Sequence, residues 1–149
     1  ELDITNHSSV KIFITDNAID IIINCAAYTY VDRAEAQFEL SEEINHLAVS
    51  NFSRIAKEKK IKLIHVSTDY VFDGTNYKPY LESDKTCPKS VYGSTKLNGE
   101  NSMQEINPEN SIIIRTSWVY SIYGDNFVKT MLRLGKEKKE LGIIFCSFS

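Results

Sequence analysis

Short β-branched runs alternate along the chain with longer segments of helical periodicity, and this alternation restricts the fold more than any other feature. Strands are expected over residues 21–25, 62–67 and 111–116, and helices over residues 32–60, 91–104 and 126–139. Strands that alternate with helices form βαβ units, in which helices cover a mostly parallel sheet. The sequence therefore predicts an α/β fold of the Rossmann-like, doubly wound class.

Several finer features follow from the same patterns. Asp32 and Glu35 have the spacing of a capping box, and we read them as a helix cap rather than as paired catalytic carboxylates. The inward face of the helix that follows is expected to carry Leu40, Ile44, Leu47, Ala48, Ile55 and Ala56. In the helix over residues 126–139, the inward side is expected to carry Phe127, Met131 and Leu134. A short helix is expected over residues 10–18, and a further strand is expected to begin at residues 143–145.

Composition and charge exclude several classes of protein. The chain has 149 residues, 42% of them hydrophobic, with a net charge of −3 and no basic run that would indicate nucleic-acid binding. Its apolar runs, such as residues 21–23, are far too short to cross a membrane, and no secretory signal opens the chain. Three widely spaced cysteines argue against a disulfide framework or a zinc site. We therefore expect a reduced, cytoplasmic protein without a metal, in which Cys25 ends an apolar strand inside the core.

Polar and aromatic residues follow each of the three expected strands. In parallel sheets, ligands bind outside the carboxyl ends of the strands. This rule points to residues 25–28, 67–70 and 116–120, which should share one rim of the sheet.

Tyr92 and Lys96 are spaced i, i+4 at the start of an expected helix, so that both side chains project from one face. A tyrosine can donate a proton to a carbonyl oxygen while a hydride reaches the carbon, and a nearby ammonium would lower its pKa from about 10. The Thr68 hydroxyl at a strand end could hold the same oxygen. A Tyr–Lys pair at this spacing more often lies on a solvated helix face. The catalytic interpretation therefore depends on the position of the pair near the rim.

Three other residue types on or near the rim leave two interpretations open. Ala26 and Ala27 are small enough for the close approach of a flat cofactor, but they would equally suit tight helix–strand packing. Trp118 could stack on a substrate or pack in the core. His65 lies inside a strand, where a histidine is more often a hydrogen-bonded core residue than a ligand.

Taken in order, the segments 23–29, 67–74, 91–100, 115–120 and 126–131 resemble those of the dTDP-4-dehydrorhamnose reductases, in the extended short-chain dehydrogenase/reductase family. Ser-Thr-Asp-Tyr-Val-Phe-Asp-Gly and Arg-Thr-Ser-Trp-Val-Tyr are the most diagnostic stretches. The resemblance implies reduction of the C4 keto group of dTDP-4-dehydro-L-rhamnose to dTDP-L-rhamnose, with NADPH or NADH as hydride donor. It also implies a dTDP-sugar as the binding partner, no nucleic acid or membrane partner, and it is compatible with a homodimer.

The resemblance assigns roles to residues of this chain. The catalytic residues would be Thr68, Tyr92 and Lys96. The cofactor would be bordered by Asp3, Ile4, Ala26, Ala27, Tyr28, Tyr92 and Lys96. The sugar substrate would be faced by Val31, Asp69, Tyr70 and Trp118.

The chain also departs from the family pattern. It contains no Gly-x-x-Gly-x-x-Gly turn for a pyrophosphate, and it ends before most of a substrate domain. We therefore expect residues 1–149 to be a partial NAD(P)-binding domain that lacks the first βαβ unit, has no second complete domain, and is inactive alone. Two alternatives remain: a non-catalytic homologue similar to the methionine adenosyltransferase regulatory subunit, and a nucleotide-sugar epimerase or dehydratase. Tyr70 stands where dehydratases of this scaffold carry glutamate, which favours simple reduction.

Overall fold

The structure is a computed structural model that describes residues 2–140 and 142. Its centre is a parallel sheet in the order β1-β2-β3, formed by β1 (Ile21–Asn24), β2 (Lys62–Thr68) and β3 (Ser111–Thr116). Ile22 pairs with Leu63 and Ile64 pairs with Ile112, so all three strands run in register in one direction. The three expected strands and the α/β class are confirmed, whereas the expected strand at residues 143–145 lies outside the described residues.

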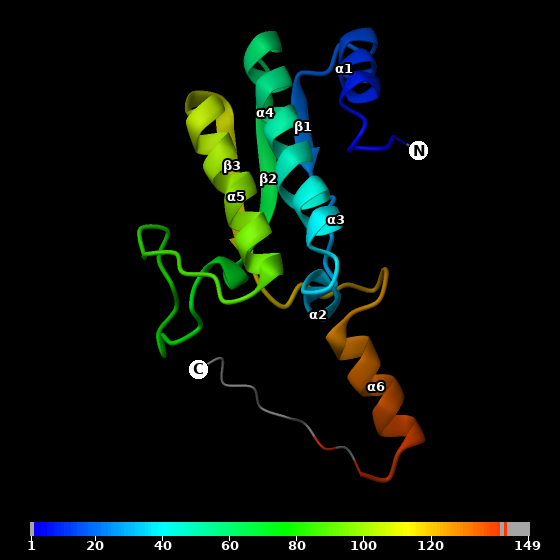
Figure 1. Ribbon diagram of the computed structural model, residues 1–149. Coiled ribbons are helices and arrows are strands. Elements are labelled where there is room, and N and C mark those ends of the chain that lie inside the picture. Colours follow the sequence, from blue (N-terminus) through cyan, green and yellow to red (C-terminus); the bar gives the residue numbers. More distant parts are fainter. Residues whose placement is uncertain (1, 141, 143–149) are drawn as a thin grey trace.

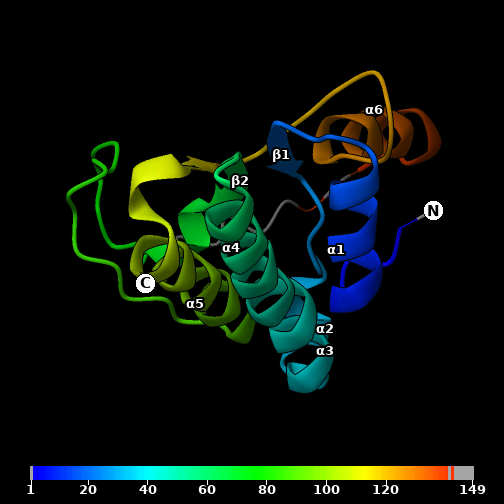
Figure 2. The ribbon, with the colours of Figure 1, turned by 90° about the horizontal axis from the view of Figure 1, so that it is seen from above.

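One face of this sheet is covered by two long helices, α4 (Ala48–Lys59) and α5 (Val91–Ile106), which lie side by side in both ribbon views (Figures 1 and 2). Helix α1 (His7–Asp16) packs beside α4, and Asn6 caps it through Ser9 N–H. The buried apolar core lies between these elements and comprises Val10, Ile14, Val49, Phe52, Ile55, Ala56, Leu63 and Met103. Burial of this apolar surface is the main favourable contribution to folding.

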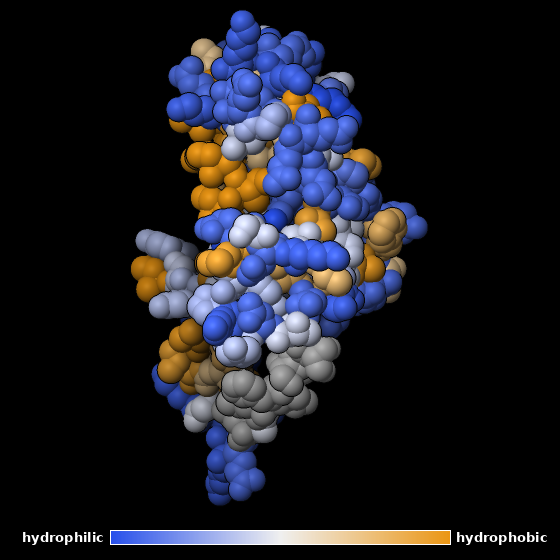
Figure 3. All heavy atoms as spheres, turned by 90° about the vertical axis from the view of Figure 1, so that its left-hand side faces the viewer, coloured by the Kyte–Doolittle hydropathy of each residue, from blue (hydrophilic) through white to orange (hydrophobic). Residues whose placement is uncertain are grey.

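The opposite face of the sheet is open among the described residues. The side chains of Ile21, Ile23, Ile112 and Ile114 are exposed, and Figure 3 shows an apolar patch on the flank of the molecule that bears β3. Helix α6 (Phe127–Glu137) extends away from the sheet, as Figure 1 shows, and none of its residues is buried. The expected inward face of this helix was therefore wrong: Phe127 is exposed, and Met131 and Leu134 are only half-buried. No helix among the described residues is both long and apolar enough to cross a bilayer.

The single helix expected over residues 32–60 is divided into four elements: α2 (Val31–Ala34), α3 (Phe38–Glu42), a π-helical turn η1 (Glu43–Leu47) and α4. The helix is interrupted over residues 35–37, where Gln37 accepts the Tyr28 hydroxyl at 2.6 Å and Glu35 accepts Val91 N–H at 2.9 Å. The expected capping box is wrong, since Tyr30 precedes α2 without a side-chain cap.

The inward face that we expected for the long helix is confirmed only in its second half. Ala48, Ile55 and Ala56 are buried in the core, whereas Leu40 and Leu47 are exposed. Cys25, expected in the core, is exposed as well, because it follows the last residue of β1. A short 3-10 turn, η3 (Pro108–Asn110), connects α5 to β3.

Helix α5 approaches η1 so closely that only glycine fits at the crossing. A Cβ on Gly99 would overlap the backbone carbonyl oxygen of Asn45 and would lie 3.5 Å from the Val49 Cβ. Gly99 therefore fixes the distance between the helix that carries Tyr92 and the one before it.

We expect Gly99→Ala to destabilise the protein by about 1–3 kcal/mol, because overpacking displaces backbone and outweighs the gain in helix propensity. The matched control is Gly135→Ala in α6, where an added Cβ meets no atom within 4 Å and should stabilise by roughly 0.5–1 kcal/mol. Urea unfolding of both variants tests this, and equal shifts would contradict the close approach.

Candidate active site

The three strands end at one edge of the sheet, as expected, and Thr68 is the last residue of β2. Its side chain is buried at the start of the 3-10 turn η2 (Asp69–Val71), where Oγ1 donates to Asp69 Oδ1 at 3.1 Å and accepts from Tyr70 N–H at 3.2 Å. These bonds hold the Thr68 hydroxyl at the carboxyl end of the sheet, where ligands bind in this class of fold.

The first turn of α5 is held at the same place by two caps. Ser90 Oγ accepts Gly93 N–H at 3.1 Å, and the Glu35 carboxylate accepts Val91 N–H, a favourable position for negative charge. A Cβ on Gly93 would overlap the Tyr70 carbonyl oxygen, so that α5 begins directly against η2. The ring of Tyr92 consequently lies edge-on to that of Tyr70, with 5.5 Å between centroids.

Tyr92 is half-buried and interacts with Thr68. Burial raises the pKa of the Tyr92 hydroxyl above its ordinary value of 10.0, and a hydrogen bond with Thr68 opposes that rise. The nearby Asp69 and Tyr70 raise the pKa of Tyr92 further. The expected lowering by Lys96 is therefore wrong for this state of the site, and the phenol stays protonated at neutral pH.

The reason lies in the direction of the Lys96 side chain, which is 1% exposed. Its Nζ donates to the Val66 carbonyl at 2.7 Å and lies 3.0 Å from His65 Nε2, so it points at β2. Burial lowers the pKa of Lys96 to about 8, and the charge of Glu100 opposes this shift. Burial, followed by the Lys96 charge, lowers the pKa of His65 to about 3. His65 is thus a hydrogen-bonded core residue, as expected, but its contact with Lys96 was missed.

The depressed pKa of His65 predicts acid sensitivity. The unfolded chain takes up a proton at this residue below about pH 6.5, whereas the folded protein does not until about pH 3, so stability is lost as the pH falls through this window. We expect a loss of up to about 1.4 kcal/mol per pH unit from this group, and a shallower loss in His65→Gln. Urea unfolding between pH 7 and pH 4 measures it. His7→Gln is the control, because His7 is exposed. Parallel curves of unfolding free energy against pH for the parent, His65→Gln and His7→Gln would contradict the depressed pKa of His65.

A buried ion pair connects α5 to β3 next to Lys96. Arg115 binds the fully buried Glu100 carboxylate through Nε and Nη2, with a shortest distance of 2.7 Å. Ser67 donates to the same carboxylate from β2, and the Arg115 guanidinium lies 5.0 Å from the centroid of the Phe72 ring. The Glu100 carboxylate therefore connects α5, the helix that carries Tyr92 and Lys96, to both β3 and β2.

A pocket of about 520 Å³ opens beside η2. Val31, Asp69 and Tyr70, three of the four expected substrate residues, line it. Lys89 also lines this pocket and is the one cation among the described lining residues, a feature that sequence reasoning missed because Lys89 stands in a long loop without periodicity. Trp118 does not line the pocket: it is 68% exposed and its ring packs edge-on against Phe127 at 4.9 Å.

Apart from Tyr92 and Lys96 on α5, the expected cofactor residues lie on two segments. Ala26 is exposed and Ala27 half-buried directly after β1, while Tyr28 is buried and its N–H donates to Asn45 Oδ1 at 2.9 Å. Asp3 is exposed and accepts Thr5 N–H at 2.9 Å, and Ile4 packs against the core below it. The N-terminal segment lies on the β1 side of the molecule, away from α5 (Figure 1).

The family model described as RmlD substrate binding domain matches residues 1–145 of the chain. The chain belongs to this family. Its relatives include the dTDP-4-dehydrorhamnose reductase of Escherichia coli, which is 46% identical over 142 residues, or 95% of this chain and 47% of the relative. The crystal structure of the Bacillus anthracis reductase in complex with NADP is 44% identical and superposes with a TM-score of 0.90, over 94% of this chain and 50% of that one. The chain thus spans about half the length of the curated relatives that it matches.

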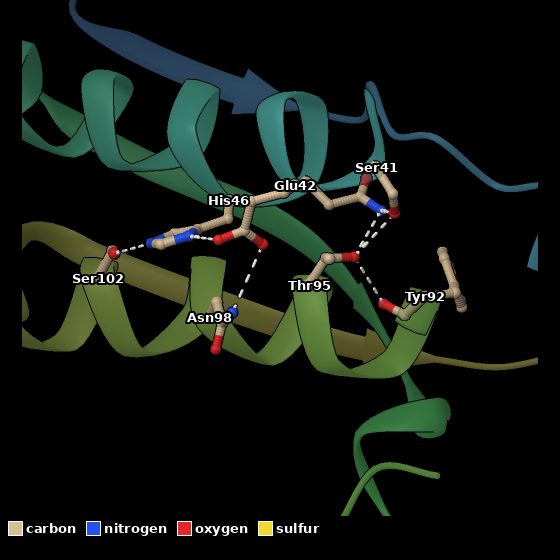
Figure 4. A network of polar contacts seen from close by, with 8 residues as sticks. Ser41, Glu42, His46, Tyr92, Thr95, Asn98 and Ser102 are labelled. Carbon is tan, nitrogen blue, oxygen red and sulfur yellow. Dashed lines mark hydrogen bonds and ion pairs between the residues drawn. The ribbon is translucent and has the colours of Figure 1, made fainter. Parts of the chain in front are cut away.

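A second polar network in this RmlD-family chain has the composition of a hydrolytic triad. Figure 4 shows Glu42, His46 and Ser102, with 2.5 Å from the Glu42 carboxylate to His46 Nδ1 and 3.0 Å from Nε2 to Ser102 Oγ. Ser102 lies in the middle of α5, however, where the backbone N–H groups already bond within the helix and cannot form an oxyanion hole. We therefore regard this network as structural, joining α3 and η1 to α5.

Proposed function

We propose that the protein containing this chain reduces the C4 keto group of dTDP-4-dehydro-L-rhamnose to dTDP-L-rhamnose, with NADPH or NADH as hydride donor. The observation that carries the proposal is the position of Tyr92: it lies in the first turn of α5, which packs directly against the turn that follows Thr68 at the carboxyl end of β2, beside a pocket lined by Asp69 and Tyr70. The activity of relatives such as the E. coli enzyme, a dTDP-4-dehydrorhamnose reductase, supports it.

The residues at the rim fit a nicotinamide cofactor. Ala26 and Ala27 have no side chain beyond Cβ, so that a flat ring can approach the backbone after β1, with Tyr28, Asp3 and Ile4 farther along. The Lys96 amine, which bonds to the Val66 carbonyl in this structure, would have to turn toward the rim to hold the nicotinamide ribose, and Tyr92 would lie beside it. The bound cofactor would supply the hydride to the carbonyl carbon.

The remaining chemistry belongs to this chain. The Thr68 hydroxyl would hold the substrate carbonyl oxygen, and the Tyr92 hydroxyl would donate its proton to that oxygen. The phenol is protonated before each turnover, but its raised pKa makes it a weaker acid, and the interaction with Thr68 opposes that rise. Thr68 would stabilise the phenolate that forms.

In the proposed complex, Val31, Asp69 and Tyr70 would face the sugar, and Trp118 would approach from the segment after β3. Lys89 lines the same pocket, together with the carboxylates of Asp32, Asp69 and Asp73. Residues 1–149 would then form part of one cofactor-binding domain that also carries the catalytic groups. A reducing, cytoplasmic location fits Cys25 and Cys87, which are both free.

The proposal is tested by replacing the matching half of the E. coli reductase with the 142 aligned residues of this chain. We expect the purified chimera to oxidise NADPH when the keto-sugar nucleotide is added, followed by absorbance. A chimera that unfolds cooperatively and binds NADPH, but gives no turnover with this sugar, would overturn the proposed activity. The same assay on the separate 149-residue chain, which has no glycine-rich turn, is expected to show none.

A further inference from the structure

A single hydrogen bond joins two elements that line the pocket beside η2. One of these elements is α2, and the other is the segment directly before α5. The bond runs from Val91 N–H to the Glu35 carboxylate at 2.9 Å, although the two residues are far apart in the sequence. Among the described residues, no other hydrogen bond connects residues 30–37 with residues 88–93.

Helix α2 depends on tertiary contacts for its position. It is a single turn, no side chain caps its first residue, and helices this short are unstable without such contacts. Two side-chain bonds hold the chain directly after it: the Tyr28 hydroxyl donates to Gln37, and Glu35 accepts from Val91. The first of these bonds leads back to the segment after β1. The second leads to the helix that carries Tyr92, which lies beside α2 in Figure 1.

The Val91 N–H is a donor that α5 itself cannot satisfy. Val91 is the first residue of the helix, where backbone N–H groups have no acceptor within the helix. The Ser90 hydroxyl accepts from Gly93 N–H and leaves Val91 N–H to another acceptor. A carboxylate is favourable at this end of a helix. No cation forms an ion pair with Glu35 among the described residues, so the bond to Val91 fixes the direction of its side chain.

We propose that Glu35 is a positioning residue that sets the separation of α2 from the start of α5, and thereby the fit of the sugar in the pocket that both elements line. Glu35 is not among the described residues that line the pocket, so it acts through Val31 and Asp32 of α2. The separation depends on the reach of the side chain, because the carboxylate must extend from the end of α2 to Val91 N–H. The relevance to the sugar rests on the function proposed above, whereas the bond itself does not.

Other contacts hold the catalytic tyrosine and the cofactor segment if the Glu35 bond is lost. The Thr95 hydroxyl donates to the Tyr92 carbonyl at 3.0 Å, as Figure 4 shows. The segment after β1 is held separately, because Asn45 bonds to both the N–H and the carbonyl of Tyr28. Loss of the Glu35 bond should therefore weaken sugar binding, while proton donation and cofactor binding stay in place.

Substitutions at Glu35 in the chimeric reductase separate reach from charge. Glu35→Ala removes both, Glu35→Asp keeps the charge but is one methylene shorter, and Glu35→Gln keeps the length and an acceptor oxygen without the charge. We expect the Ala and Asp variants to raise the KM of the sugar nucleotide by about five- to tenfold, the scale of a lost helix cap, with kcat within about threefold of the parent value. The Gln variant should match the parent. Glu39→Ala is the control and should also match it, because Glu39 is exposed on α3 and takes no part in this bond.

Two kinetic results would overturn the positioning role. If Glu35→Asp matches the parent while Glu35→Gln behaves like Glu35→Ala, the charge matters and the reach does not. If kcat falls while the KM of the sugar nucleotide is unchanged, Glu35 acts on the reaction step and not on the fit of the sugar.

Amide hydrogen exchange of Val91 in the 149-residue chain tests the bond without any turnover. Exchange at Val91 should become about fivefold faster or more in Glu35→Ala and Glu35→Asp, and stay at the parent rate in Glu35→Gln. An unchanged rate in Glu35→Ala would overturn the inference whatever the substrate. If the exchange responds as expected but the parent chimera does not turn over the keto-sugar nucleotide, the proposed function fails together with the role in sugar binding, and the link between α2 and α5 stands.

Discussion

Tyr92→Phe is expected to lower the turnover of the chimeric reductase by about two to four orders of magnitude, the range for losing a general acid. The substitution removes only the hydroxyl that interacts with Thr68, and it leaves the ring against Tyr70. Substrate protonation would then depend on water. The NADPH dissociation constant should stay within about threefold of the parent value, since no ring contact is lost.

Steady-state rates together with fluorescence titration of NADPH separate these two effects. Tyr77→Phe serves as the control, because Tyr77 is exposed and lies outside the site, so that its rate should match that of the parent. Near-normal turnover in Tyr92→Phe would remove Tyr92 from the reaction and leave Thr68 or a water molecule as the proton donor.

Glu100→Gln is expected to cost about 3–5 kcal/mol of the free energy of unfolding, the usual result of removing one partner from a buried ion pair. Arg115 would retain its charge next to Phe72 with no carboxylate, and the Ser67 hydroxyl would lose a charged acceptor. A loss of this size is a large fraction of the stability of a small domain.

Glu137→Gln is the matched control for this experiment. It removes the same group from an Arg–Glu pair, that of Arg133 and Glu137 at 3.1 Å, but on the exposed surface of α6, where the expected cost is below about 1 kcal/mol. Urea unfolding compares the two. A double variant, Glu100→Leu with Arg115→Met, should recover much of the loss, because apolar side chains of similar size need no charge partner. Equal effects of the two Gln variants would mean that burial of the pair is unimportant.

The sequence predicted well those elements whose patterns depend on local burial. The three strands and α5 carry apolar residues at the regular spacing that burial in a sheet, or against its face, requires. Their observed bounds lie within about two residues of the expected ones. The prediction of one long helix over residues 32–60 was wrong, because residues at its interruption bond to partners outside the segment. Glu35 caps α5, and the Tyr28 hydroxyl reaches Gln37, neither of which leaves a periodic signal.

The candidate site shows the same division. The positions of Thr68, Tyr92 and Lys96 follow from strand ends and helical spacing, so that sequence motifs could predict them. The direction in which Lys96 points could not be predicted, since it depends on a histidine on a neighbouring strand and on how deeply both are buried. For the same reason the sign of the Tyr92 pKa shift was wrong: spacing gives proximity along a helix, not the contacts of the amine.

The parallel arrangement of β1, β2 and β3 also has a consequence for how the chain assembles. Asn24 and His65, which face each other across β1 and β2, are 41 residues apart, and no strand pair is joined by a hairpin. Each pair must therefore close a long loop, with its entropy cost, before its first cross-strand bond forms. Helices α4 and α5, whose backbone hydrogen bonds are local, can form earlier and provide a surface against which the strands pack. We therefore expect the packing of α5 against η1, where Gly99 meets Asn45, to form before the strands pair.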